Sequence, residues 1–303
     1  MINKIVLACV LIALSAGCDN AQTPPVLQSK PPGDKPFVIG LIPEQNIFKQ
    51  MERYEPLAGY LSKKTGVVIK LKVLPRYGNI VDNFVSTSMD GAFFGSFTYS
   101  LAKAKLGVEV LARPERKGVS TYHGLIFVRK GSGIRTASHM AGKVFAFVDK
   151  ATTAGYLLPL SYFNKNGIRD YRVYFRETYF AGTHEDTIYD VLNKKADIGA
   201  AKNTVFNMLA ASDPRIKNEL VILEKSPDVP ENGFAVRKDC EPALKNRLKE
   251  ALLHMHNDPE GREALNGLGF DRFIVTVDSD YRPVYRYASE AGLYLQTYDY
   301  IND

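Results

Sequence analysis

Two adjacent hydroxyl side chains stand where an apolar segment gives way to a stretch with helical periodicity. Residues 144–148 form a continuous apolar run that predicts a buried strand, and Thr152 and Thr153 lie in the polar turn after it, just before Gly155. Such a turn at a helix N-terminus can bind an anion, because unpaired N–H groups and the helix dipole both favour negative charge there. The alternative interpretation is that one of the threonines only caps the helix.

Other polar residues stand at or near the ends of predicted strands and could share a pocket with this turn. They are Tyr77, Ser96, Tyr122, His123, His184 and Glu185. Each of these alone is more often a cap, a turn residue or a buried structural histidine. Together they describe a pocket of neutral hydrogen-bond donors without a pairing of nucleophile and base. We therefore expect binding rather than catalysis, and we predict no catalytic residue.

The sequence lacks the spacings that are typical of metal, nucleotide and hydrolase sites. There is no HExxH, no paired-cysteine motif, no GxSxG and no P-loop. We therefore expect no metal and no cofactor. The net charge of +6 is compatible with an anionic small ligand or an anionic membrane surface. Because lysine and arginine form no dense run, we expect no nucleic-acid binding.

The N-terminus carries the pattern of a processing signal. Residues 1–18 read MINKIVLACVLIALSAGC, with Lys4 before an apolar run that is too short to span a bilayer. The small residues before Cys18 resemble the lipobox of bacterial lipoprotein signals, which implies removal of residues 1–17 and lipidation of Cys18. The alternative is an ordinary secretory signal with an accidental cysteine. Residues 18–36 contain five of the 16 prolines and little apolar content, so we expect a Pro-rich tether.

The body that follows, from about residue 37 to 303, is long enough for two domains of roughly 100–150 residues. Strands alternate with helices along it, which predicts an α/β fold with mostly parallel sheets covered by helices. A cleft between two such lobes is a natural small-molecule site, since parallel strands bind ligands at their carboxyl ends.

Local patterns set the expected bounds of several elements. Asn46 predicts a helix N-cap, and Thr183 with an acidic residue three positions later predicts another helix start. Residues 171–180, rich in tyrosine, valine and phenylalanine, predict a single strand. Residues 279–300 carry aromatic side chains at helical spacing.

The body resembles a known protein family along nearly its whole length. The segments that carry the resemblance are IGLIPEQN (39–46), PRY (75–77), DGAFFGSF (90–97), TYHGLIFV (121–128), DKATTAGYLLP (149–159) and AGTHEDTIYDVLNKKADIGA (181–200). The last two are the most specific. They resemble the solute-binding proteins of phosphate, phosphite and phosphonate ABC transporters, the phosphonate-binding branch of the type 2 periplasmic binding fold.

The resemblance implies two α/β lobes joined by two crossings that form a hinge. Lobe 1 would comprise residues 37–118 and 228–303, and lobe 2 residues 119–227. It further implies high-affinity extracytoplasmic binding of a small phosphorus oxyanion and delivery to an ABC transporter permease. We expect a monomer that Cys18 anchors by lipid to a membrane of the cell envelope. The alternatives are a sensing lipoprotein that signals to a membrane kinase or cyclase, and a binder of another small anion.

The resemblance also implies roles for single residues. The family's hydroxyl turn falls on Thr152 and Thr153, with Ala154 where another hydroxyl often stands, and the family's ligand histidine falls on His184. The candidate ligand-binding residues are Tyr77, Phe94, Ser96, Tyr122, Thr152, Thr153, Ala154, His184, Lys202 and Asn203.

Two of these positions depart from the family pattern. Phe94 lacks the hydroxyl of a second aromatic ligand position. Lys202, followed by Asn203, comes just after the predicted strand at 196–201, where aminophosphonate binders carry an acidic or amide group. We expect Lys202 to repel a ligand's ammonium group, which favours phosphate, phosphite or a simple alkylphosphonate over 2-aminoethylphosphonate. The alternative is that Lys202 points to solvent.

Overall fold

The computed structural model describes residues 35–86 and 88–302. The predicted signal segment, the predicted lipidation site Cys18 and most of the predicted tether lie outside the described residues. Within the described part, no helix combines the length and the apolar character that crossing a membrane requires.

A six-stranded sheet combines strands that are far apart in the sequence. Its order is β13 (Arg272–Val275), β4 (Glu109–Glu115), β12 (Gly233–Val236), β3 (Gly91–Phe94), β1 (Phe37–Leu41) and β2 (Ile69–Val73). β1 pairs in parallel with β2 and β3, whereas β12 runs antiparallel to both of its neighbours, β3 and β4. The centre of this sheet is therefore filled by a strand that comes late in the chain.

A five-stranded sheet is built from a continuous middle segment of the chain. Its order is β10 (Leu220–Lys225), β6 (Gly124–Arg129), β9 (Ile198–Lys202), β7 (Val144–Phe147) and β8 (Glu177–Phe180). β7 pairs in parallel with β8 and β9, but β6 is antiparallel to β9 and β10. Both sheets are mixed, so the expectation of mostly parallel sheets was wrong, because the returning strands run against their neighbours.

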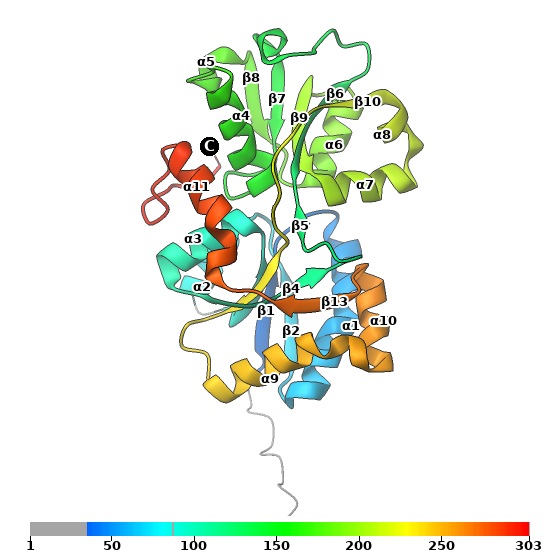
Figure 1. The fold of residues 1–303 in the computed structure, drawn as a ribbon, viewed down its shortest axis with the longest axis vertical. Coiled ribbons are helices and arrows are strands. Elements are labelled where there is room, and N and C mark those ends of the chain that lie inside the picture. The colour runs from blue at the N-terminus through cyan, green and yellow to red at the C-terminus, as the bar shows by residue number, and fades with distance from the viewer. Residues whose placement is uncertain (1–34, 87, 303) are drawn as a thin grey trace, which may run out of the picture. The chain divides into compact units, whose positions relative to one another are not determined.

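Two short strands join the sheets. β5 (Thr121–Tyr122) and β11 (Val229–Pro230) pair antiparallel, and Figure 1 shows the chain leaving the six-stranded sheet through β5 and returning through β11. We call these two strands the hinge, the six-stranded sheet with its helices the first lobe, and the five-stranded sheet with its helices the second lobe. The residue boundaries of the lobes given above stay a prediction.

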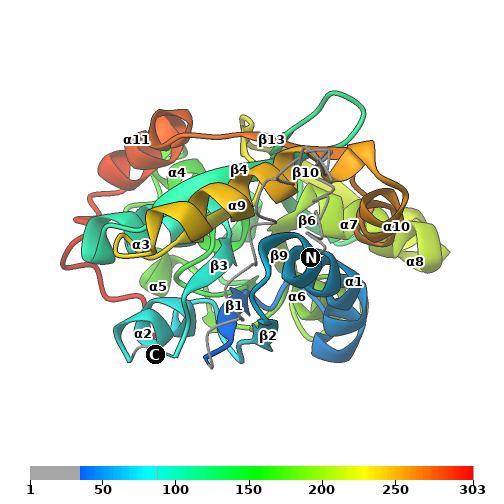
Figure 2. The same cartoon turned by 90° about the horizontal axis from the view of Figure 1, so that it is seen from below.

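Helices cover both faces of each sheet. The first lobe carries α1 (Ile47–Thr65), α2 (Asn79–Val85), α3 (Ser96–Leu106), α9 (Pro242–Leu253) and α10 (Pro259–Leu268). The second carries α4 (Leu158–Lys165), α5 (Tyr171–Tyr174), α6 (His184–Leu192), α7 (Asn203–Ser212) and α8 (Pro214–Glu219). α1 and α9 contact each other on one face of the first sheet, as Figure 2 shows from below, while α11 (Arg282–Glu290) contacts α3 and α4 and so touches both lobes.

Local sequence signals explain two of the helix starts. Asn46 caps α1, because its side chain accepts hydrogen bonds from the backbone N–H groups of Phe48 and Lys49. Thr183 caps α6 by accepting from the N–H of Asp186. Both predicted caps are confirmed. The cap at Thr183 matters for the site, since it sets His184 as the first residue of α6.

An aromatic core fixes the strand that leads to the threonine turn. Phe145 and Phe147 of β7 are fully buried, with ring centroids 4.6 Å apart, and Phe145 also packs edge-on against Phe163 of α4 at 5.3 Å. Such ring pairs add to the stability gained from burying apolar area. The end of β7, and with it the start of the turn, is therefore held rigidly.

Two predicted elements differ from the structure. Residues 171–180 do not form one strand, because Asp170 accepts from the N–H of Arg172 and starts the single turn of α5, so that β8 begins only at Glu177. The aromatic periodicity of residues 279–300 produces α11 over only part of that range. The remaining aromatic residues belong to a tail whose side chains make tertiary contacts instead.

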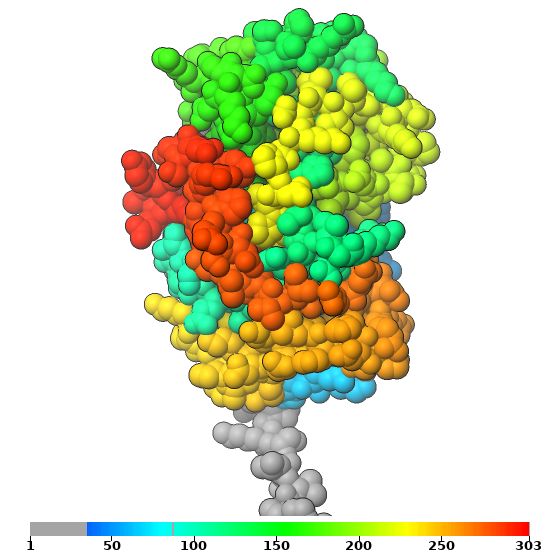
Figure 3. Space-filling model, in the orientation of Figure 1, coloured from blue at the N-terminus to red at the C-terminus, as the bar shows by residue number. Residues whose placement is uncertain are grey.

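This tail contacts both lobes. The Tyr300 hydroxyl donates to Asp82 in α2 at 2.6 Å. Asn302 accepts from the N–H of Lys150 at 3.0 Å and donates to Asp149 at 2.9 Å, in the turn before Thr152. In Figure 3 the red C-terminal segment lies against both the cyan-green part of the first lobe and the green part of the second.

Candidate binding site

A small cavity lies where the two lobes and the hinge meet. Six of the ten predicted ligand-binding residues line it: Tyr77, Tyr122, Thr152, Thr153, His184 and Lys202. The other lining residues are Ile42, Glu44, Gly95, Thr98 and Asn232. The structure therefore brings the six predicted residues together from five separate segments of the chain. Their role as ligands stays a prediction.

The threonine turn presents a helix N-terminus to the cavity. A π-helical turn (Thr153–Leu157) continues directly into α4. The first N–H groups of such a helix have no acceptor within it and are available to an anion. Gly155 permits this arrangement, since a Cβ atom there would lie 2.4 Å from the Cβ of Val148. A side chain at this position would push the turn away from β7.

The two threonine hydroxyls differ in what they offer. The Thr152 hydroxyl donates to the backbone oxygen of Asp149 at 2.7 Å, so its proton is already used. The Thr153 oxygen instead accepts from the N–H of Phe97, in the first turn of α3, at 2.8 Å. The Thr153 hydroxyl also pairs with the phenol oxygen of Tyr122, another residue that lines the cavity. Neither side chain caps the helix, so the alternative interpretation as a simple cap was wrong.

His184 is a neutral hydrogen-bond donor. It is only 3% exposed, and its Nδ1 accepts from the backbone N–H of Lys202 at 3.3 Å, which places the ring proton on Nε2. Burial lowers the pKa of His184 to about 4, even though nearby Glu44 acts in the opposite direction. The ring packs edge-on against that of Tyr77, with centroids 5.9 Å apart.

Tyr77 contributes a buried hydroxyl that is not satisfied. Its side chain is 2% exposed, and no atom of the described residues pairs with its hydroxyl oxygen. Burial raises the pKa of Tyr77 well above the ordinary value, so the phenol keeps its proton. A buried hydroxyl without a partner is unfavourable. An acceptor placed in the cavity would relieve this.

The opposite wall of the cavity is ionic. Lys202, at the end of β9, is 4% exposed, and its Nζ lies 3.0 Å from Glu44 Oε1, in contact with Glu231 Oε1 and 3.2 Å from Asn232 Oδ1. The same Nζ lies 4.5 Å from the centre of the Tyr122 ring. Burial acts against the charge of Lys202, but Glu231 and Glu44 raise its pKa above the ordinary value. The alternative interpretation, that Lys202 points to solvent, was wrong, because the side chain is buried.

Sequence reasoning missed the partners of Lys202. Glu44 follows β1, within one of the segments that carried the family resemblance, whereas Glu231 and Asn232 follow β11. Burial of Glu44 acts to raise its pKa, but the positive charge of Lys202 brings that pKa below the ordinary value. The ionic cluster is therefore Lys202, Glu44, Glu231 and Asn232.

The remaining four predicted residues do not line the cavity. Phe94 is fully buried and packs its ring against Phe84, with centroids 5.5 Å apart. Ser96 is also fully buried, and its hydroxyl donates to the backbone oxygen of Pro230 in the hinge. Both residues support the site from behind.

Ala154 and Asn203 also lie outside the cavity lining. Ala154 is buried beside Gly124, where it leaves little room for a side chain on that glycine. The Asn203 side chain accepts from the N–H of His123 at 3.1 Å, next to the hinge. Glu185, considered with His184, accepts from the N–H of Asn46 at 2.9 Å and so joins the lobes at the rim.

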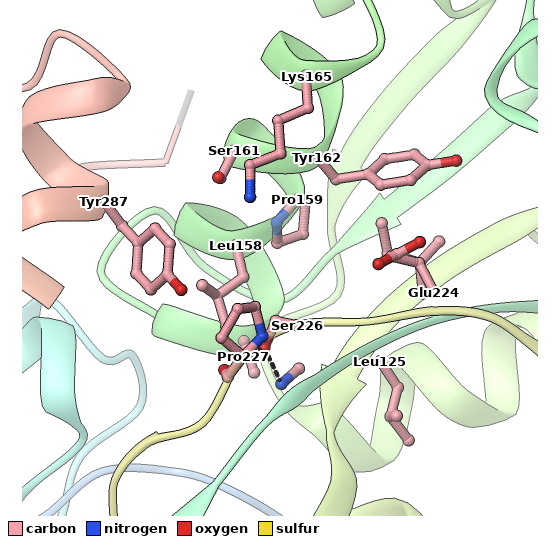
Figure 4. Close-up of a pocket in the computed structure, with 13 residues that line it drawn as sticks. Leu125, Leu158, Pro159, Ser161, Tyr162, Lys165, Glu224, Ser226, Pro227 and Tyr287 are labelled. Carbon is pink, nitrogen blue, oxygen red and sulfur yellow. Dashed lines mark hydrogen bonds between the residues drawn. The ribbon is translucent and has the colours of Figure 1, made fainter. Parts of the chain in front are cut away.

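Two larger hollows lie nearby. One is a groove that shares Glu44, Lys202 and Asn232 with the cavity, so the ionic cluster separates the two. The other, shown in Figure 4, is a mostly apolar pocket bordered by Leu158 and Tyr287. Lys165, Ser161 and Ser226 also border this pocket, but none of its lining groups in the described part of the chain is a buried polar atom without a partner, as the Tyr77 hydroxyl in the cavity is. The cavity is therefore the better candidate for an anion.

Comparison with known proteins agrees with this architecture. The family described as "ABC transporter, phosphonate, periplasmic substrate-binding protein" matches residues 39–281. The phosphonates-binding periplasmic protein of Escherichia coli is 25% identical over 257 residues, covering 83% of this chain and 75% of that protein. The phosphate-import protein PhnD of Mycolicibacterium smegmatis is 25% identical over 260 residues, covering 82% and 80%.

Solved structures show the same fold. A binding protein of an ABC phosphonate transporter from Pseudomonas aeruginosa superposes with a TM-score of 0.80 at 23% identity, covering 86% of this chain and 87% of that one. PhnD1 from Prochlorococcus marinus, in complex with methylphosphonate, gives a TM-score of 0.76 at 20% identity, covering 84% and 98%. The expected type 2 periplasmic binding fold is confirmed. The chain belongs to the family of periplasmic substrate-binding proteins of phosphonate ABC transporters.

Proposed function

We propose that this protein binds a small phosphorus oxyanion, such as phosphate, phosphite or a phosphonate, in the cavity and delivers it to the permease of an ABC transporter. The main support is the buried hydroxyl of Tyr77, which has no partner in the described part of the chain and lines the cavity. The Thr153 hydroxyl, the His184 Nε2–H and the helix N-terminus add further donors. Each of them is neutral.

Neutral donors suit an anion with several oxygens. A phosphoryl group can accept several hydrogen bonds at once, and bonds to a charged acceptor are stronger than those between neutral groups. The start of the π-helical turn adds a favourable dipole. The binding site therefore needs no free cation to hold its ligand.

Contacts between the lobes support binding by closure. Besides the bond between Phe97 and Thr153, the Thr98 hydroxyl donates to the backbone oxygen of Ala151 at 2.8 Å. Both bonds join α3 to the turn that presents Thr153. A ligand that contacts both lobes favours this arrangement over a more open one.

The delivery role includes attachment to a membrane. The lipobox-like residues before Cys18 support lipid anchoring, with the Pro-rich tether holding the binding lobes near a permease. Replacing Cys18 with alanine should release the protein from the membrane fraction without changing its affinity for ligand. Recovery of the wild-type chain without lipid from its native envelope would contradict the anchor.

A ligand screen tests the binding function. Phosphate, phosphite, methylphosphonate, 2-aminoethylphosphonate and sulfate are added separately, and thermal unfolding is recorded. A ligand present at about 100 times its dissociation constant adds about 2.7 kcal/mol to the free energy of unfolding. We expect this with at least one phosphorus compound and not with sulfate. Absence of any shift with all four phosphorus compounds at millimolar concentration would contradict the proposal.

A further inference from the structure

The ionic cluster places a protein ammonium group where the cavity meets the outer groove. Lys202 Nζ contacts two carboxylates and an amide oxygen and faces the Tyr122 ring. The side chains of Lys202, Glu44 and Glu231 are 5%, 19% and 9% exposed. This is a complete and largely dry binding site for one ammonium group, and it borders the cavity that offers neutral donors to an anion.

The partners of Lys202 come from the other side of the cleft. Lys202 ends β9 in the second lobe, whereas Glu44 follows β1 in the first lobe and Glu231 follows the hinge strand β11. The ion pairs therefore form between parts of the molecule that the hinge connects. A buried carboxylate pair without a cation would be strongly unfavourable.

We propose that Lys202 serves as a built-in ammonium group, which fills the acidic site beside the anion cavity and excludes ligands that carry their own ammonium group. This proposal rests on the proposed function. It selects phosphorus oxyanions without a cationic substituent, such as phosphate, phosphite or methylphosphonate, and it supplies an ion-paired contact between the lobes that does not depend on the ligand.

Occupancy of the acidic site by Lys202 differs from the simple repulsion between Lys202 and a ligand's ammonium group that the sequence predicts. Lys202 brings one positive charge against two carboxylates, so the cluster as a whole does not repel a cation. Under repulsion, removing Lys202 would only abolish discrimination between ligands. Under occupancy, removing it leaves a vacant acidic site, and an aminophosphonate should then bind more tightly than an alkylphosphonate.

Calorimetric titration of the purified full chain tests the proposal, with methylphosphonate and 2-aminoethylphosphonate as probes. The wild type should bind methylphosphonate more tightly. Lys202→Ala should invert the ranking, with a gain of at least about tenfold for the amino compound, as expected for a hydrogen bond to a charged partner. The double variant Lys202→Ala/Glu231→Gln should lose most of that gain. Lys70→Ala, at an exposed lysine of β2, is the matched control and should change neither affinity.

A second variant and a second readout guard against loss of folding. Lys202→Gln keeps most of the side-chain volume, and its amide can donate to the carboxylates, so it should fold. Because that amide fills part of the acidic site, the gain for the amino compound should be smaller than in Lys202→Ala. Ethylammonium, which can fill the vacated acidic site, should raise the thermal midpoint of Lys202→Ala but not that of the wild type.

The outcomes separate this inference from the proposed function. A wild type that binds none of the phosphorus compounds contradicts the proposed function. A wild type that binds 2-aminoethylphosphonate as tightly as methylphosphonate overturns the inference, whatever the variants do. Binding of methylphosphonate by the wild type with no gain for the amino compound in either Lys202 variant overturns the inference alone.

Discussion

The two walls of the cavity differ in the kind of polar group that they carry. On the wall formed by the threonine turn, Tyr77 and His184, the polar groups are uncharged donors, and the Tyr77 hydroxyl has no partner within the described residues. On the ionic wall, Lys202 and its carboxylate partners satisfy one another. The charged groups therefore lie where they neutralise one another, and the uncharged donors line the part of the cavity that a ligand would occupy.

This difference shows how a buried site can bind an anion without a free cation. A lysine that was free to bind phosphate would have to give up its partners or remain unpaired when the site is empty, and both states are unfavourable in a poorly solvated place. Dipoles and neutral hydroxyl groups carry a smaller penalty. The following changes break or sharpen this contrast, from the largest expected effect to the smallest.

Lys202→Met should have the largest effect on stability. It leaves the carboxylates of Glu44 and Glu231 without their shared cation, and breaking a buried ion pair costs about 3–5 kcal/mol. Urea unfolding at pH 7 measures the loss. Adding Glu231→Gln and Glu44→Gln to the same chain should restore much of it, since the neutral amides can share hydrogen bonds. Equal stability of the wild type and Lys202→Met would mean that the ionic wall is dispensable.

His184 should give the protein a pH dependence on the neutral wall. Its pKa is about 4 in the folded protein against an ordinary value of 6.5. The unfolded chain therefore binds a proton more readily, and the stabilising contribution is complete above pH 6.5 and lost as the pH falls towards 4. The difference corresponds to about 3 kcal/mol.

Urea unfolding at pH 7 and pH 4.5 checks this, with His184→Gln compared with the wild type. The variant should lose less stability on acidification, whereas His139→Gln, at an exposed histidine, should behave like the wild type. Because the bound form of His184 is the neutral donor, ligand affinity should not rise between pH 7 and pH 5. A rise that disappears in His184→Gln would show that the imidazolium is the binding form.

Thr153→Val and Thr152→Val compare two neighbouring hydroxyls. Thr153→Val removes a hydroxyl that lines the cavity, and a hydrogen bond to a charged ligand is worth about 1.5–3 kcal/mol, so affinity should fall roughly ten- to a hundredfold. Thr152→Val removes a bond to the backbone of Asp149 and should lower stability by about 1 kcal/mol, with a smaller effect on affinity. Titration calorimetry decides the order. The reverse order would place Thr152, and not Thr153, on the ligand.

Tyr77→Phe should have the smallest effect on stability, with opposite signs for stability and affinity. Affinity should drop roughly ten- to a hundredfold, because one donor to a charged ligand is lost. Stability without ligand should be unchanged or slightly higher, because the hydroxyl that is removed has no partner in the described structure. Thermal unfolding with and without ligand measures both. A clear loss of stability in the ligand-free variant would mean that the hydroxyl serves the fold rather than the ligand.

The neutral wall could be predicted from the sequence because its signals are local. The threonine turn follows an apolar strand and opens a helix, and Thr183 sets the position of His184 within a few residues. The ionic wall could not, since the partners of Lys202 come from remote turns and become buried only when the lobes meet. The prediction that Phe94 lines the binding site did not hold for a related reason. The sequence places Phe94 in a strand, but the packing of α2 decides what its ring contacts.

The prediction of mostly parallel sheets was wrong because it could not take account of pairing between strands that are far apart in the sequence. Alternation of strand and helix is a local pattern, and it does not show that β12 will insert between β3 and β4. Likewise, the aromatic spacing of residues 279–300 has the period of a helix, yet several of these rings are used for contacts to both lobes. Tertiary pairing overrides local periodicity in each case.

The late insertion of β12 also bears on the order in which the protein can fold as the chain emerges during synthesis or export. All strands of the second sheet come from one continuous segment, so that sheet can assemble as soon as β10 has emerged. The first sheet has a gap at its centre until β12 arrives, which leaves β3 and β4 with unpaired edges during that interval. Exposed strand edges invite pairing with other chains. Vectorial emergence therefore makes the first lobe the more vulnerable to aggregation, and a chain cut before β12 should retain a foldable second sheet but not the first.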